Sequence, residues 1–72
     1  MQRMEIMFTV KKGNQARVKE QLLKMGCRRV VYEKTDVSNE LAGTVKLNVD
    51  LRKDVEAFLY RDNSTSLINF KL

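Results

Sequence analysis

The sequence predicts an α+β fold with the element order β-α-β-β-α-β. Three observations predict it: apolar residues alternate in the first and last segments, two stretches have the apolar spacing of amphipathic helices, and two β-rich stretches lie between those helices. Each βαβ half needs a right-handed crossover, which places both helices on one face of a four-stranded antiparallel sheet. We therefore expect a single ferredoxin-like two-layer sandwich over residues 1–72.

The first strand and the first helix are predicted from a change of apolar period. Alternation over residues 4–11 is typical of a half-buried strand. Asn14 is a good N-cap for a helix over about residues 14–25, where apolar residues recur at i, i+4 and i+7. Gly26 follows at a position where glycines commonly end helices.

Residues 28–37 are rich in β-branched and aromatic residues and predict the second strand. Two inward faces compete there. One places Val30 and Tyr32 against the core, and the other places Val31 and Val37 there. The alternation of apolar residues in this segment is compatible with both inward faces.

The second half of the chain repeats the pattern of the first. After a turn at residues 38–40, alternation over residues 44–49 predicts a strand that forms a hairpin with the one before it. Asp50 is expected to cap a second helix, which residues 62–64 end, and residues 67–72 alternate again as the last strand. The predicted core consists of Ile6, Phe8, Val10, Val18, Leu22, Met25, Val45, Leu47, Val49, Val55, Phe58, Leu59, Ile68 and Phe70.

The composition is that of a folded protein, with 43% hydrophobic and 32% charged residues and no proline. The single cysteine, Cys27, excludes an internal disulfide. Two interpretations of this thiol compete: a small buried side chain at the helix end, or a thiolate activated by Arg28 and Arg29.

Because the first residues lack the apolar run of a signal peptide and no stretch is long enough to span a membrane, we expect a cytoplasmic protein with no membrane contact.

Charge is unevenly distributed along the chain. Residues 1–36 carry nine basic and four acidic residues and so account for the whole net charge of +5. Many of these bases flank or lie on the first helix, which predicts a surface for nucleic acid or for an acidic partner; the competing interpretation is a solvated helix face. The candidate binding residues are Lys11, Lys12, Arg17, Lys24, Arg28 and Arg29.

Residue types that carry common enzyme chemistry are scarce. The chain has no histidine, which removes the commonest general base and zinc ligand, and its three glycines are too far apart for a phosphate-binding loop. We expect no enzymatic activity, no catalytic residue, no bound metal and no cofactor. The sheet positions expected to face away from the helices carry no certain aromatic residue, which disfavours RNA binding by base stacking on the sheet.

In outline the chain resembles small ferredoxin-like regulatory modules of the ACT and NIL kind. The matching stretches are the strand at residues 6–10, the loop at residues 12–14, the helix end at residues 22–27 and the strand at residues 42–49. The resemblance implies dimerisation and binding of a small metabolite at the first loop. The chain departs from such modules in carrying a lysine pair, Lys11 and Lys12, at that loop.

Three functional hypotheses follow. The first is a small basic interaction module that binds a protein partner as a regulator or inhibitor, in the manner of small phage or mobile-element proteins. The second is nucleic-acid binding through the basic first helix and its flanks, and the third is metabolite binding at Lys11–Asn14, as in ACT-like domains. A homodimer through the sheet face or an edge strand is a further expectation, since strand edges invite pairing and Met7 and Leu67 are expected on the open face.

Overall fold

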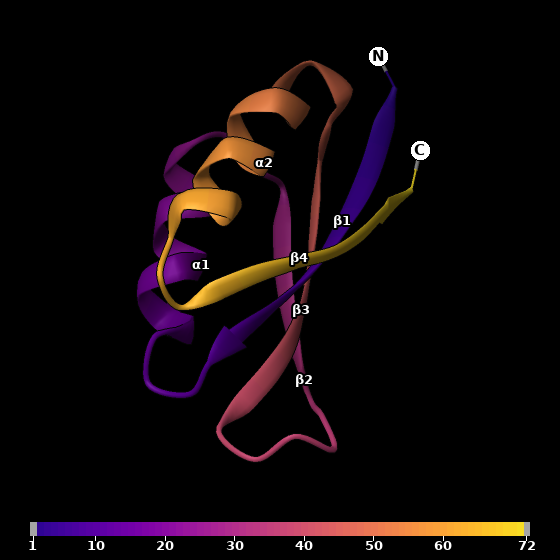
Figure 1. Cartoon of the computed structure of the whole chain (residues 1–72). Helices are drawn as coiled ribbons and strands as arrows, with labels where there is room; N and C mark the ends of the chain where they lie inside the picture. Colours follow the sequence, from indigo (N-terminus) through magenta and orange to yellow (C-terminus); the bar gives the residue numbers. More distant parts are fainter. Residues whose placement is uncertain (1, 72) are drawn as a thin grey trace.

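The computed structural model describes the backbone of residues 2–71 and the side chains of residues 2–68. The strands form one antiparallel sheet in the order β2-β3-β1-β4, and both helices cover the same face of it (Figure 1). This is the predicted ferredoxin-like sandwich. The elements are β1 Arg3–Lys11, α1 Gln15–Lys24, β2 Arg29–Lys34, β3 Glu40–Asn48, the 3-10 turn η1 Val49–Leu51, α2 Arg52–Arg61 and β4 Thr65–Lys71.

Strand β1 lies between β3 and β4 in the sheet, and its alternation predicted that one of its faces is buried. It pairs with β3 along its whole length, from Arg3 opposite Asn48 to Lys11 opposite Glu40, and with β4 on its other side. Its four inward side chains are all buried beneath the helices, so the predicted face is confirmed. These side chains are Met4, Ile6, Phe8 and Val10.

The centre of the core is a row of side chains that crosses three strands. Gly43 of β3 lies opposite Phe8 of β1 and opposite Tyr32 of β2. A Cβ atom at Gly43 would come within 2.5 Å of Phe8 Cζ, so only glycine leaves room for this ring. Phe8 meets Tyr32 edge to face with ring centroids 6.1 Å apart, and the Tyr32 hydroxyl donates a 2.8 Å hydrogen bond to the Gln15 carbonyl at the start of α1. This row therefore joins three strands to a helix.

The open question about β2 is settled by the same row. Val30 is buried and Tyr32 is half-buried under the helices, whereas Val31 is exposed on the other face. Strand β3 begins at Glu40, earlier than predicted, because Asn39 adopts a left-handed φ of 67° and closes the hairpin at that point. Figure 1 shows the β2–β3 hairpin extending beyond the rest of the sheet.

Helix α1 begins where Asn14 predicted it to begin. The Asn14 side chain, however, makes no capping hydrogen bond. The Gln15 side-chain oxygen instead accepts a 2.6 Å hydrogen bond from the Gly13 N–H. Gly26 ends the helix with a φ of 105°, as predicted, because glycine adopts this conformation without steric cost.

The predicted role of Asp50 as the cap of the second helix is wrong. Asp50 lies inside η1, and α2 begins only at Arg52. Leu51 packs against the core, and one of its methyl carbons lies 3.3 Å from the position of a Cβ on Gly26. This packing favours a tight turn over residues 49–51, which takes Asp50 away from the helix start.

The predicted inward face of the last strand is wrong at Ile68. The pairing of β4 with β1 shifts register between Met7 and Phe8, so that Phe8 lies opposite Leu67 and Met7 lies opposite Asn69. Ile68 is the extra residue of this β-bulge and is 54% exposed, while Leu67 takes the inward position against the core. The expectation that Leu67 lies on the open face is wrong for the same reason.

The rest of the predicted core is confirmed where it is described, with Met25, Val49 and Phe58 half-buried against it. The side chain of Phe70 lies outside the described residues. Three further buried side chains, Met4, Cys27 and Val30, match interpretations that the sequence offered, whereas the burial of the polar Thr65 was not predicted. The Thr65 hydroxyl donates a 2.6 Å hydrogen bond to the Leu59 carbonyl, so this buried oxygen is satisfied.

Gly43→Ala should destabilise the protein by about 1–3 kcal/mol, because the new methyl group displaces the buried Phe8 ring. Urea unfolding followed by circular dichroism measures this change. The same substitution in a Phe8→Leu background should cost less, since the smaller side chain leaves space over residue 43. Equal unfolding midpoints for the wild type and Gly43→Ala would contradict the packing described above.

Candidate functional site

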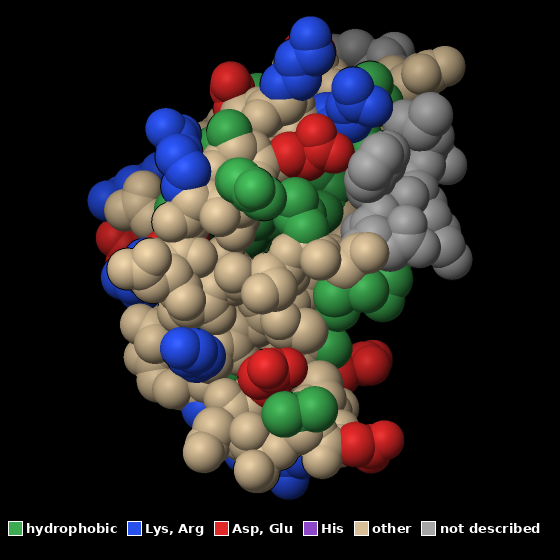
Figure 2. Space-filling model, in the orientation of Figure 1, with side chains coloured by type: hydrophobic (Ala, Val, Ile, Leu, Met, Phe, Trp, Pro, Cys, Tyr) green, Lys and Arg blue, Asp and Glu red, His purple; other side chains and the backbone are tan. Residues whose placement is uncertain are grey.

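The six candidate basic residues are all exposed, but the fold separates them into two groups. Lys11, Lys12 and Arg17 lie near the start of α1, whereas Lys24, Arg28 and Arg29 lie near its end. A ten-residue helix spans about 15 Å between these groups. Figure 2 shows Lys and Arg side chains scattered over the visible face of the molecule, with no single patch.

Arg17 is held by an acid from the end of α2. Its guanidinium donates two hydrogen bonds to the Asp62 carboxylate, at 2.8 and 3.1 Å, and one to the Ser64 hydroxyl at 3.1 Å. The Asp62 side chain is only 10% exposed, whereas the Arg17 side chain is 49% exposed. The Arg17 hydrogen bonds lower the pKa of Asp62 to about 2, assisted by donors from Ser64. The Arg17 guanidinium therefore stabilises the fold through Asp62, which makes Arg17 a weaker candidate for binding a ligand.

A polar hollow of about 430 Å³ lies beside this ion pair, between the loop that precedes α1 and the loop that follows α2. The two loops are tied together, since the Lys11 N–H donates a 2.9 Å hydrogen bond to the Ser64 carbonyl. Asp62 neutralises Arg17 within the hollow, which weakens the attraction of this site for an anionic ligand. The lining residues are Lys11, Asn14, Arg17, Asp62, Asn63 and Ser64.

The second group of candidate cations is divided between the two faces of the molecule. Lys24 forms an exposed ion pair with Glu20, 3.1 Å away on the same helix. Arg29 alternates with the buried Val30 and so lies on the face away from the helices, opposite Lys46 of β3. Arg28 precedes the strand, and its N–H donates a 2.8 Å hydrogen bond to the Lys46 carbonyl.

We call the helix-free face of the sheet the open sheet face; from the sequence it was expected only as a surface for a homodimer. A row of Val31, Thr44 and Met7 crosses it from β2 to β1. Val31 is 40% exposed, and Ile68 adds an exposed apolar side chain near the β4 end of the row. The described residues of the open sheet face are Arg3, Glu5, Met7, Thr9, Lys11, Arg29, Val31, Glu33, Glu40, Ala42, Thr44, Lys46, Asn48, Ser66 and Ile68.

Charges border the apolar row of the open sheet face unevenly. Towards the start of β1, Arg3, Arg29 and Lys46 make one end basic, and Glu5 pairs with Lys46 at 3.7 Å. Towards the other end, Glu33 lies opposite Ala42. The open sheet face therefore has an apolar middle with a basic border on one side.

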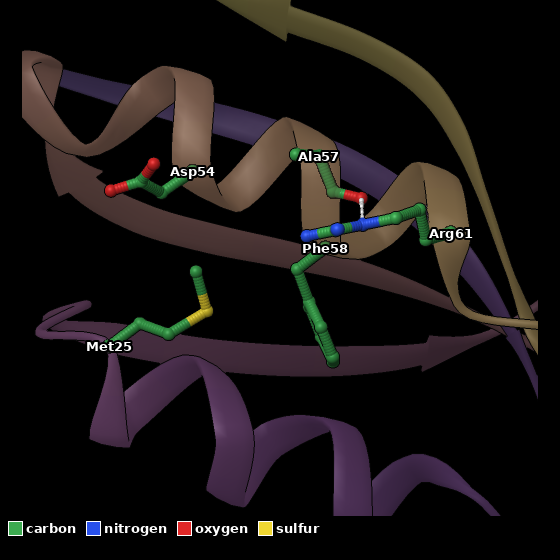
Figure 3. A pocket seen from close by; sticks show the side chains of 5 residues that line it. All are labelled: Met25, Asp54, Ala57, Phe58 and Arg61. Atoms are coloured by element: carbon green, nitrogen blue, oxygen red, sulfur yellow. Dashed lines mark hydrogen bonds between the residues drawn. The ribbon is translucent and has the colours of Figure 1, made fainter.

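A shallow groove of about 420 Å³ separates the two helices on the opposite face of the molecule (Figure 3). Met25 and Phe58 extend into the space between the helices, and Asp54 and Arg61 lie along α2. The Arg61 Nε–H donates a 3.3 Å hydrogen bond to the Ala57 carbonyl. Met25 and Phe58 both pack against the core, so the apolar floor of this groove belongs to the seam between the helices.

Cys27 matches the buried interpretation. Its side chain is part of the core, and burial raises the pKa of the thiol to about 11. The hypothesis of a thiolate activated by Arg28 and Arg29 is therefore wrong, because burial favours the neutral thiol.

Within residues 2–71, no three His, Cys, Asp or Glu side chains form a group that could hold a metal ion. Neither of the helices described is long and apolar enough to cross a membrane. Comparison with protein-family models finds no match, and comparisons with curated proteins and with solved structures find none. The surfaces described above are therefore the only indication of function among the residues that the structure describes.

Asp62→Asn should lower the thermal unfolding midpoint at neutral pH by a few degrees, because the neutral amide loses the charged pair with Arg17. The pKa of Asp62 is about 2 in the folded state and 3.8 ordinarily, so this stabilisation is present above about pH 5 and is lost as the pH falls towards 2. Thermal unfolding of both proteins from pH 7 to pH 2 should give midpoints that converge in acid.

Asp36→Asn serves as the control, since Asp36 is exposed in the β2–β3 loop. It should change the midpoint little at any pH in this range. A difference between the wild type and Asp62→Asn that persists undiminished at pH 2 would show that the ion pair is not its source.

Proposed function

We propose that this chain is a non-enzymatic interaction module that binds an acidic protein partner on its open sheet face and regulates or inhibits that partner. The observation that carries the proposal is the uncovered apolar row of Val31, Thr44 and Met7, with Ile68 exposed beside it. Both helices lie on the other face, so no described element of this chain shields the row from solvent.

The row crosses three neighbouring strand positions in the middle of the open sheet face. Neighbouring strands lie about 4.8 Å apart, so the path from Val31 through Thr44 to Met7 is about 10 Å long. Protein interfaces commonly have an apolar centre and a polar rim that hydrogen-bonds with the partner. Thr9 and Ser66, which lie opposite each other beside the row, carry hydroxyl groups that supply such polar contacts.

The charge distribution favours an acidic partner. Arg3, Arg29 and Lys46 border one end of the row, with Glu5 as the nearest opposing charge. The net charge of +5 adds a long-range attraction for acidic surfaces. A partner with an apolar patch bordered by carboxylates fits both features.

A photoreactive amino acid placed at position 44 should crosslink the partner in the cells that make this protein, because Thr44 lies in the middle of the open sheet face. The same amino acid at position 21 is the control, since Gln21 is exposed on α1, on the other face. Mass spectrometry identifies the adduct and separates a partner from a second copy of this chain. An adduct with another protein at position 21 alone, or at neither position, would contradict the proposal.

Substitutions within the row then test its contribution. Met7→Lys combined with Ile68→Lys should abolish capture of the crosslinked partner, because two ammonium groups would enter the apolar contact. Val37→Lys is the matched control, since Val37 is an apolar side chain, 56% exposed, in the β2–β3 loop. Equal capture by the wild type and both variants would show that the row is not the contact surface.

Nucleic-acid binding is the second candidate, supported by the exposure of all six candidate cations. The engagement of Arg17 by Asp62 and of Lys24 by Glu20 reduces the cations available for phosphate contacts. Gel shifts with random RNA and DNA at low salt test this candidate, since phosphate-driven binding is strongest there. Binding that Arg28→Glu with Arg29→Glu abolishes would favour nucleic acid over a protein partner, and an absence of binding at low salt would exclude it.

Metabolite binding of the ACT-like kind is the remaining candidate, and the polar hollow beside Lys11 and Asn14 supports it. The ion pair between Arg17 and Asp62 occupies one wall of this hollow. An acidic metabolite would compete with Asp62 for Arg17, which makes this candidate weaker than binding on the open sheet face. The finer resemblance to ACT and NIL modules stays a prediction.

A further inference from the structure

Strand β2 lies at one edge of the sheet with half of its backbone groups unpaired by β3. In an antiparallel pair, successive residues direct their N–H and C=O groups alternately towards the neighbouring strand and away from it. The Lys46 carbonyl accepts a hydrogen bond from the Arg28 N–H, so Lys46 faces β2, and Arg29 opposite it faces β3. It follows that Val30 and Tyr32 direct their backbone groups to the free edge.

The side chains along this edge are complementary to those of the same edge in a second copy of the chain. We infer that a second copy of this chain pairs with the edge, β2 against β2 in antiparallel orientation, with Val31 opposite Val31. This register places Arg29 of each copy opposite Glu33 of the other, and Val30 of each opposite Tyr32 of the other. The backbone groups of Val30 and Tyr32 would then pair across the twofold axis. The two sheets become one eight-stranded sheet.

Two features favour this register over its neighbours: the alternation of side chains along the strand and the position of the two charged residues. A shift of one residue would set inward side chains of one copy against outward side chains of the other, which places the helices of the two copies on opposite faces. A shift of two residues would set Arg29 or Glu33 opposite Val31. Pairing centred on Val31 therefore keeps all four helices on one face and matches both charges.

The two charges are available for this pairing. Arg29 and Glu33 are exposed, and neither forms an ion pair with any described residue of its own chain. Beyond them, Lys34 of one copy would lie opposite Arg28 of the other, a contact between like charges. Arg28 precedes the strand, so this contact limits the paired segment to residues 29–33.

An exposed apolar side chain borders the same edge on the helix side. Arg17 lies on the flank of α1 that faces α2, because it binds Asp62 at the end of that helix. Leu23 is six residues further along and so lies about 120° from Arg17 in projection, on the opposite side of the core-facing stripe of Val18 and Leu22. Leu23 is 43% exposed and extends the apolar character of the β2 edge.

Charge reversal tests the pairing. At low salt the average mass of the wild type in sedimentation equilibrium should rise with concentration from 8.4 kDa towards twice that value. Arg29→Glu alone and Glu33→Arg alone should each raise the dissociation constant about tenfold or more, because each turns two attractive pairs into two repulsive ones. An equimolar mixture of the two variants should associate again, since every acidic position in the mixed pair faces a basic one.

The outcomes are decisive in either direction. Circular dichroism establishes that each variant is folded, and Val37→Lys, in the hairpin loop, should associate like the wild type. Met7→Lys with Ile68→Lys should also leave the association unchanged, which separates this edge from the proposed contact on the open sheet face. A wild type that stays at 8.4 kDa at every concentration would overturn the inference, and so would a dimer that neither charge reversal weakens.

Discussion

The fold depends on the placement of the Phe8 ring over a strand position that has no side chain. Gly43 lets the ring lie against β3. Tyr32 of β2 meets the Phe8 ring edge to face, and its hydroxyl donates a hydrogen bond to the Gln15 carbonyl at the start of α1. The row joins β1, β2 and β3 to α1, and the core forms on this face of the sheet because both helices cover it. The open sheet face and the free edge of β2 are what this one-sided packing leaves for contacts with other molecules.

Much of the fold was predictable, because burial on one side of a sheet imposes a period of two on the strands. The inward face of β1 follows from Ile6, Phe8 and Val10 alone. The bulge in β4 was not predictable, since Leu67 and Ile68 are both apolar and the extra residue depends on pairing with β1. The alternation of the isolated segment therefore placed the wrong member of this pair inward.

The sequence predicted which basic residues are exposed, but it did not predict where they lie relative to one another on the surface. Exposure of the lysines and arginines follows from the cost of burying charge. The ion pair between Arg17 and Asp62 joins residues that are 45 positions apart in the sequence, so local residue spacing could not predict it. The outward position of Arg29 became evident only when Val30 and Tyr32 were known to face the core. Thus the clustering of basic residues in the sequence did not predict that the folded chain places them on two different faces.

The ring of Phe8 over Gly43 is open to direct observation by NMR, because protons beneath an aromatic ring are shielded by its ring current. The Gly43 Hα resonances should lie upfield of their usual range and should show cross-relaxation with the Phe8 ring protons. This result would establish the packing that leaves one face of the sheet open. Gly43 Hα resonances at unshifted positions, without contacts to Phe8, would contradict the account at its centre.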